Sequence, residues 1–249
     1  MTNKEIFEKF DKMHSYSFAT IDGDYPEIRI AHFITYDDEG LYFQTMKVKP
    51  FYNQLKKTNK VAVCALISSE GPVIHDEKGL SNFPLGYFIR VSGDVKELSN
   101  EELNLKSEKN SKFLPLVKDV ERYPTMTTFV LYRFKGEVYD YDFEKENRSN
   151  KIERFRFSFG SMQYIQPGFH ILKDKCISCG TCAKVCTFEA IIPGEKYSIN
   201  SSRCDECGSC YSACPVNAIV AKTPLEEEYR KEVGKKIINY AKSINRERK

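Results

Sequence analysis

Two copies of one cysteine motif constrain this chain more than any other feature of its sequence. The spacing C-x2-C-x2-C-x3-C occurs at residues 176–186 and again at residues 204–214, and the two copies contain eight of the nine cysteines. The close C-x2-C-x2-C turns supply three thiolates from one loop, and a cubane [4Fe–4S] cluster needs four thiolates around it. The motif therefore predicts clusters that carry single electrons at low potential.

Zinc sites and disulfides are the other uses of cysteine that compete with this interpretation. Zinc is bound by pairs of C-x2-C cysteines, whereas here three successive cysteines carry this spacing in both copies. A disulfide framework is typical of small secreted chains, and residues 1–12 lack the apolar segment of a secretory signal peptide. No run approaches the ~20 apolar residues of a membrane span. We therefore expect a cytoplasmic protein without membrane partners, from an anaerobe.

The similarity of the two copies extends beyond the cysteines. The sequence Thr-Phe-Glu-Ala-Ile-Ile after Cys186 matches Pro-Val-Asn-Ala-Ile-Val after Cys214, at a period of 28 residues. Residues 166–222 resemble the bacterial two-[4Fe–4S] ferredoxin family, which implies two like halves and interleaved ligation. One cluster would be held by Cys176, Cys179, Cys182 and Cys214. The other would be held by Cys204, Cys207, Cys210 and Cys186.

One residue departs from the ferredoxin pattern. Pro215 follows Cys214 as the pattern expects, but Thr187 replaces the corresponding proline after Cys186. We interpret this as a tolerated change, because the proline shapes a turn and does not bind iron. Apolar residues shared by both copies are expected to pack around the clusters and exclude water; they are Ala190, Ile191, Ala218 and Ile219.

The chain has 249 residues, so a second domain is expected beside the cluster region. Turn signals at residues 22–24 and 37–40 separate short apolar segments. We predict helices at residues 4–13, 49–58 and 101–120. Strands are predicted at residues 15–21, 28–36, 41–45, 61–68, 85–95 and 127–141, and one more at residues 154–160. Antiparallel strands with hairpin turns and few crossover helices are typical of a barrel.

Several segments of this N-terminal region carry a second resemblance. Residues 18–26, 28–30, 40–45, 47–49 and 59–63 look like the FMN-binding split barrel of the pyridoxamine-phosphate-oxidase-like superfamily. The likeness covers about residues 5–145, and it implies an FMN site at a homodimer interface.

The expected fold class is therefore α+β, in three parts. An N-terminal antiparallel split β-barrel would occupy residues 1–150, and a ferredoxin-type two-cluster domain would occupy residues 166–223. A terminal amphipathic helix would occupy residues 224–249, with Leu225, Tyr229, Val233, Ile237 and Ala241 on its packed face.

The resemblance implies that cations from the first strands hold the flavin phosphate. Arg29 is the first candidate, because arginine binds phosphate in a planar fork and an unpaired charge between Ile28 and Ile30 would be costly. Lys49 and Lys47 follow, each with a solvated surface charge as the alternative. Thr45 could donate its hydroxyl to the same phosphate. Three residues match positions that line the isoalloxazine ring in the family; they are Ile30, Ala31 and Gln44.

Other residues with possible chemistry give no catalytic assignment. His32 could reach the flavin edge or be a structural histidine, and the other histidines (His14, His75, His170) are interpreted as structural or surface residues. Cys64 is expected to be a small apolar core residue. The chain has a net charge of +3 and no basic stripe interleaved with aromatics, so nucleic acid is not an expected partner.

The two resemblances together suggest a redox function. Clusters carry single electrons whereas FMN can pass two, so their fusion would link a one-electron donor to a small electron-poor substrate. No nicotinamide fingerprint is present, so a ferredoxin-like carrier is the expected donor. The chain contains no tryptophan, and vitamin B6 oxidation is not expected. Two alternatives stay open: an electron-transfer or redox-sensing module without a substrate, and haem or another cofactor in the barrel.

Overall fold

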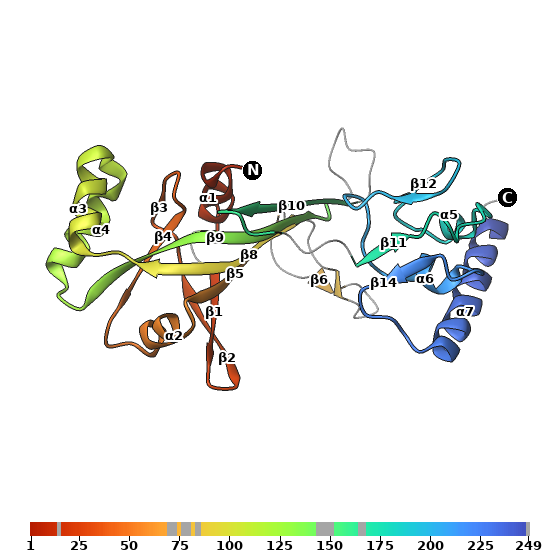
Figure 1. Cartoon of the computed structure of the whole chain (residues 1–249), viewed down its shortest axis with the longest axis horizontal. Helices are drawn as coiled ribbons and strands as arrows, with labels where there is room; N and C mark the ends of the chain where they lie inside the picture. Colours follow the sequence, from red (N-terminus) through yellow and green to blue (C-terminus); the bar gives the residue numbers. More distant parts are fainter. Residues whose placement is uncertain are drawn as a thin grey trace. The chain divides into compact units, whose positions relative to one another are not determined.

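The chain divides into two compact units. The first contains Met1–Tyr139 and Phe155–Tyr164, and the second contains Asp140–Arg154 and Ile165–Lys249. Figure 1 shows the helices and strands of each unit. The computed structural model describes residues 1–13, 16–68, 74–75, 81–82, 86–142, 152–163 and 168–247.

An eight-stranded sheet forms the framework of the first unit. Its strands follow the order β2-β1-β5-β8-β9-β4-β3, and β10 pairs with β9 outside this path. Neighbouring strands pair in the antiparallel direction, as predicted. Such pairs join β1 to β2 and β5, β4 to β3 and β9, and β5 to β8. The strands are β1 (Tyr16–Asp22), β2 (Tyr25–Ala31), β3 (Thr35–Tyr36), β4 (Leu41–Met46), β5 (Lys60–Ser68), β8 (Gly86–Glu97), β9 (Met126–Asp140) and β10 (Glu153–Phe159). A separate pair is formed by β6 (Ile74–His75) and β7 (Ser81–Asn82).

The first hairpin forms where the turn signal predicted it. Asp22 pairs with Tyr25, which leaves a two-residue turn, and its Gly23 has a φ of 60°, which glycine adopts at no steric cost. The single strand predicted at residues 28–36 is wrong. The chain leaves β2 after Ala31 and crosses to β4, because the Phe33 N–H donates to the Tyr16 hydroxyl (2.5 Å) and the next N–H donates to the Tyr42 carbonyl (2.7 Å).

Helices cover parts of this sheet. α1 (Asn3–Asp11) begins with a capping box in which Thr2 and Glu5 satisfy each other's backbone N–H groups. α2 is Pro50–Thr58. The single helix predicted at residues 101–120 is wrong: α3 (Asn100–Lys109) and α4 (Leu114–Arg122) are separated by the 3-10 turn η1 (Ser111–Phe113). Asn110 breaks the helix, since its backbone is extended and its side chain accepts from the Lys112 N–H.

The main core of the first unit lies inside the sheet. Its buried side chains come from α1, α2, β1, β4, β5, β8, β9 and β10 and from Phe33, so the sheet wraps around one apolar centre in a barrel-like manner. Ring contacts join Phe18 to Phe43 (5.1 Å between centroids) and Phe43 to Phe129 (5.8 Å). A smaller core beneath α3 and α4 contains Tyr42, Leu98, Leu103, Phe113, Leu116 and Val130.

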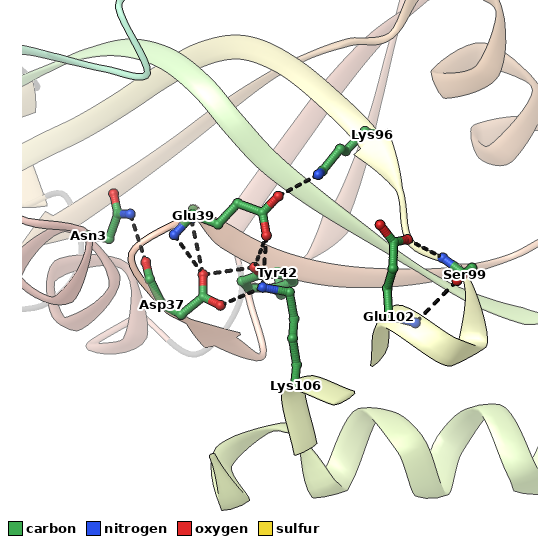
Figure 2. Close-up of polar contacts among 9 residues, drawn as sticks. Asn3, Asp37, Glu39, Tyr42, Lys96, Ser99, Glu102 and Lys106 are labelled. Carbon is green, nitrogen blue, oxygen red and sulfur yellow. Dashed lines mark hydrogen bonds and ion pairs between the residues drawn. The ribbon is translucent and has the colours of Figure 1, made fainter. Parts of the chain in front are cut away.

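A half-buried ion cluster anchors α3 to the β3–β4 hairpin (Figure 2). The ammonium group of Lys106 lies 2.8 Å from a carboxylate oxygen of Asp37 and 2.8 Å from one of Glu39. The buried Tyr42 hydroxyl donates to Asp37 at 2.8 Å, and Lys96 also pairs with Glu39. Burial alone would raise the pKa of Glu39, but the hydrogen bonds from the two lysines outweigh it and lower this pKa to about 2.

The second unit contains short elements in two similar halves. They are β11 (Phe169–Ile171), α5 (Thr181–Lys184), β12 (Ile191–Ile192), β13 (Ser198–Ile199), α6 (Ser209–Ala213) and β14 (Ile219–Ala221), and β11 pairs with β14. Left-handed backbone recurs at the predicted 28-residue period: Gly180 and Gly208 precede the two short helices. Ser178 and Glu206 form a second such pair, and so do Glu189 and Asn217.

The terminal helix α7 (Glu227–Glu247) packs beside α6 (Figure 1). The predicted packed face is partly wrong, because Tyr229 is 57% exposed whereas Arg230 is 9% exposed. Gly234 is buried in the contact, and a Cβ there would lie 2.2 Å from the Ser212 carbonyl oxygen. Glycine is therefore what allows the close approach of the two helices. No helix in the described ranges is long and apolar enough to cross a membrane.

Candidate cofactor sites

The first four predicted cluster ligands lie around one cavity. Cys176 and Cys179 lie in the loop before α5, Cys182 lies in that helix, and Cys214 follows α6. All four line the same cavity, together with apolar side chains that include Ile171 and Ile219. Burial raises the pKa of the Cys182 thiol, and the charges of Cys179 and Cys214 raise it further. The structure therefore brings Cys214 to the first cysteine loop.

The second four predicted ligands also lie together. Burial raises the pKa of the Cys210 thiol to about 12, and the charges of Cys204, Cys186 and Cys207 add to the effect. Burial also raises the pKa of Cys204, and the charges of Glu206, Cys186 and Cys207 add to the effect. A thiol with a pKa of about 12, as at Cys210, is protonated at neutral pH unless a metal compensates the thiolate charge, and a coordinating metal deprotonates its thiol ligands. This donor set suits a metal cluster.

Hydrogen bonds to sulfur repeat in the two halves. The Ala190 N–H donates to the Cys186 sulfur, and the Ala218 N–H donates to the Cys214 sulfur, each at 3.3 Å. The Thr181 hydroxyl lies 3.4 Å from the Cys179 sulfur, an interaction that lowers the pKa of this thiol, and a serine hydroxyl makes the equivalent contact in the second half. These donors stabilise negative charge on sulfur, so they favour thiolate ligands.

The alternatives to clusters fit this geometry less well. All nine cysteines are free thiols, which contradicts a disulfide framework. In the described part of the chain no three His, Cys, Asp or Glu side chains converge closely enough for a single metal ion. The first set instead surrounds a cavity, as expected when each thiolate binds a different iron of one cluster.

A larger cavity lies in the first unit, between β2, β4 and the start of α2. Its volume is about 710 Å³, within the range of about 300–1,000 Å³ for small-molecule sites. Six of the seven residues predicted to bind flavin line it: Arg29, Ile30, Ala31, Gln44, Thr45 and Lys49. The sequence-based assignment and the cavity therefore coincide at these positions.

Arg29 enters this cavity as a half-buried cation with neutral partners. Its terminal nitrogens donate to the Thr20 hydroxyl (2.5 Å) and to the Gln54 amide oxygen (2.7 Å). Its guanidinium group lies over the Phe51 ring, 4.3 Å from the centroid. Burial lowers the pKa of Arg29, and the charges of nearby Glu27 and Asp22 partly offset the effect. These neutral partners hold the Arg29 side chain in place. No carboxylate accepts a hydrogen bond from it among the described residues, so its charge is available to an anion.

The start of α2 adds positive charge to a cavity that Asp22, Glu27 and Asp119 also line. Lys49 is the N-cap residue and makes no side-chain cap, while Pro50 opens the helix and Phe51 follows in its first turn. The Pro50 nitrogen carries no hydrogen and the Tyr52 N–H donates to the Lys49 carbonyl at 3.1 Å, so it is mainly the helix dipole that favours an anion at this helix start. Lys47, the seventh predicted residue, lies elsewhere: its ammonium group is 3.6 Å from a Glu97 carboxylate oxygen.

Gln44 offers an acceptor to a ligand. Its amide nitrogen donates to the Leu116 carbonyl (3.0 Å) and to the Thr128 hydroxyl (3.1 Å), which fixes the orientation of the amide. The amide oxygen is buried and has no hydrogen-bond partner among the described residues. A buried acceptor without a partner is costly, and a ligand N–H in the cavity would satisfy it. Thr45, next to it, is 5% exposed.

Several residues differ from the expectations. Ile28 and Ile30, expected on either side of a buried Arg29, are each 68% exposed on strand β2. Cys64, expected in the core, is exposed because it lies on the outer face of β5. His32 lines the cavity, and His170 is exposed in β11. His14 and the side chain of His75 lie outside the described residues.

The sequence interpretation missed three residues that position Arg29. Thr20 and Gln54 accept its hydrogen bonds, and Phe51 lies under its guanidinium group. Thr20 and Gln54 are buried and hydrogen-bonded to each other at 2.6 Å. A buried polar residue within an apolar strand is a signal at Thr20. Nothing in the local pattern of α2 marks Gln54.

Comparisons with known proteins give these findings. Residues 169–215 match the family model of the 4Fe-4S dicluster domain, which confirms the predicted iron–sulfur domain. No curated protein matches the chain. One similar solved structure is a NimC/NimA family protein from Clostridium acetobutylicum, with 19% identity, a TM-score of 0.42 and coverage of 62% of this chain and 91% of that chain.

Two other solved structures are similar to this chain at lower scores. HutZ, the heme storage protein from Vibrio cholerae, has 12% identity and a TM-score of 0.35, with coverage of 53% of this chain and 90% of that chain. A Clostridium acetobutylicum protein related to general stress protein 26 of B. subtilis (pyridoxinephosphate oxidase family) has 15% identity and a TM-score of 0.36. Its coverage is 64% of this chain and 96% of that chain.

Proposed function

We propose that this chain is an iron–sulfur flavoprotein that passes single electrons through two [4Fe–4S] clusters to FMN and reduces a small electron-poor substrate. The observation that carries the proposal is the grouping of eight thiols into two sets of four in a region that matches a 4Fe-4S dicluster domain. Bound FMN would supply the conversion of single electrons into a two-electron reduction.

Several residues of the first-unit cavity fit FMN in charge and in hydrogen bonding. Arg29, Lys49 and the positive end of the α2 dipole would hold the phosphate. The unpartnered oxygen of Gln44 would accept from the polar edge of the ring system, while Ile30 and Ala31 would line its apolar part. Lys47 is left out of this assignment because it pairs with Glu97.

We further propose that the protein is a homodimer. The edge strand β2 lines the flavin cavity, and it exposes Tyr25 (74%), Ile28 (68%) and Ile30 (68%). An apolar edge of this kind needs a cover, and a second copy of the chain would bury it and help exclude water from the cavity. The electron donor is proposed to be a ferredoxin-like carrier in the cytoplasm.

Anaerobic purification tests the cofactor content. The expected protein is brown and contains about eight iron atoms and one FMN per chain. A colourless protein with bound zinc would contradict the cluster assignment, and a haem spectrum would contradict the flavin assignment. Product analysis after mixing reduced protein with electron-poor small molecules then separates an enzyme from a carrier, because a carrier would pass its electrons only to another redox protein.

A further inference from the structure

Arg230 of α7 is a buried cation whose hydrogen-bond partners are neutral. Its Nε and one Nη atom donate to the backbone carbonyl of Tyr211 at 3.0 and 2.6 Å. Its guanidinium group lies over the Tyr211 ring, 3.8 Å from the centroid, and the side chain belongs to the buried residues. None of the ion pairs between described residues includes Arg230. The charge of Arg230 acts on Glu227, but the Glu227 side chain is exposed and its carboxylate pairs with Lys231 at 2.7 Å.

A buried guanidinium without a counter-ion is costly, so a negative group is expected close to it. Tyr211 follows Cys210, which belongs to the second set of four thiols. A [4Fe–4S] cluster with four thiolate ligands carries net negative charge, and reduction adds one more electron to it. The cluster would therefore be the missing counter-charge.

Other charged groups also lie near this thiol set. Glu206 lies between Cys204 and Cys207, and its carboxylate is 3.1 Å from the Arg154 guanidinium group. Arg203 and Asp205 flank Cys204 in the sequence, and the buried Arg203 Nε has no hydrogen-bond partner among the described residues. Arg230 differs from Arg203 because it belongs to the buried residues, whereas Arg203 is only partly buried.

The first thiol set has a different cation. The Lys196 ammonium group donates to the Cys176 carbonyl at 2.5 Å, and Lys196 is exposed to solvent. Water and salt screen an exposed charge much more than a buried one. The two halves of the repeat thus differ in the burial of the cation beside each set.

We propose that Arg230 is a positioning residue that selectively raises the reduction potential of the cluster held by Cys204, Cys207, Cys210 and Cys186. A nearby positive charge stabilises the more negative, reduced form of a cluster, and net charge and burial are among the properties that set its potential. This inference rests on the proposed cluster ligation. The residue comes from α7, which lies outside the matched residues 169–215. Its expected effect is that electrons settle on this cluster before the other.

An anaerobic redox titration of the purified holoprotein, followed by electron paramagnetic resonance, tests the proposal. Arg230→Gln removes the charge but keeps an amide donor for the Tyr211 carbonyl. It should lower one of two cluster midpoint potentials and leave the other at its wild-type value. The matched variant Lys196→Gln should act on the other midpoint by a smaller amount, and this smaller shift should vanish at high salt.

Arg230→Lys separates charge from packing. This variant keeps the cation, so its cluster midpoint potentials should stay close to those of the wild type. If Arg230→Gln loses iron, the comparison of Arg230→Lys with the wild type still tests the role of the charge. Unchanged midpoints in Arg230→Gln with full iron content would overturn the proposal, and so would an equal fall of both midpoints or a Lys variant that behaves like the Gln variant. Wild-type protein without cluster signals would refute the proposed function itself.

Discussion

The phosphate assignment can be tested through Arg29. This side chain carries a half-buried charge that is fixed by Thr20, Gln54 and Phe51 and is free of a direct carboxylate partner in the described contacts. Replacing it with alanine should remove a charge-assisted contact to the flavin phosphate, worth about 1.5–3 kcal/mol. Since about 1.4 kcal/mol corresponds to a tenfold change, FMN affinity should fall about ten- to a hundredfold.

The assay is a titration of deflavinated protein with FMN and, separately, with riboflavin, which lacks the phosphate. Arg29→Ala should weaken FMN binding and leave riboflavin binding near its wild-type value, because only FMN carries the group that Arg29 would contact. Lys47→Ala is the matched control, since Lys47 pairs with Glu97 and should change neither affinity.

Two results would count against the reasoning. Equal losses for FMN and riboflavin would mean that Arg29 only shapes the cavity through Thr20 and Gln54. Unchanged FMN binding would remove the phosphate assignment altogether, and with it the alignment of the first strands to the split-barrel family. Iron content should be the same in all variants, because the thiol sets belong to the other unit.

The remaining predictions concern the clusters, the ion cluster and α7. Cys207→Ala should lower iron content by about half and leave FMN bound, which iron and flavin assays on one sample can check. Lys106→Met should destabilise the first unit by about 1–3 kcal/mol in chemical denaturation, because it removes the cation that Asp37 and Glu39 share and leaves Glu39 with Lys96 alone. Because the folded protein lowers the pKa of Glu39, the ionised Glu39 stabilises the fold above about pH 4.3, the ordinary pKa of a glutamate, and this stabilisation is lost as the pH falls towards about 2. The Lys106→Met variant should lose less stability over this pH range than the wild type. Gly234→Ala should loosen α7 by about 1–3 kcal/mol, since its Cβ would meet the Ser212 carbonyl oxygen at 2.2 Å, and limited proteolysis of α7 should report it; an unaltered cleavage rate would contradict the close packing.

Local patterns predicted most elements of the first unit. The hairpin at Gly23 and the helix α2 formed as expected because turn chemistry and apolar spacing act over a few residues. The break at Asn110 was not predicted, since it depends on one side chain accepting from the Lys112 N–H. The exposure of Ile28 and Ile30 was missed because periodicity does not tell an edge strand from a central one.

The two kinds of candidate site were predictable to different degrees. The cysteine spacing placed three thiols of each set in one loop, because ligand spacing within a loop is a local property of the chain, and the resemblance to two-cluster ferredoxins supplied the fourth. The flavin cavity depends on contacts between distant segments. Gln54 lies 25 residues from Arg29, and Lys47 pairs with Glu97 from another strand. Such long-range polar partners leave no periodic signal in the sequence.

The interleaving of the two cysteine motifs has a consequence for biosynthesis. The cavity lined by Cys176, Cys179 and Cys182 is completed only by Cys214, and the second loop in turn needs Cys186 from the first. In the proposed ligation, a nascent chain that ends before residue 214 would present three ligands to its first cluster and no closed site. Iron delivery to this site would then follow the synthesis of both copies of the motif.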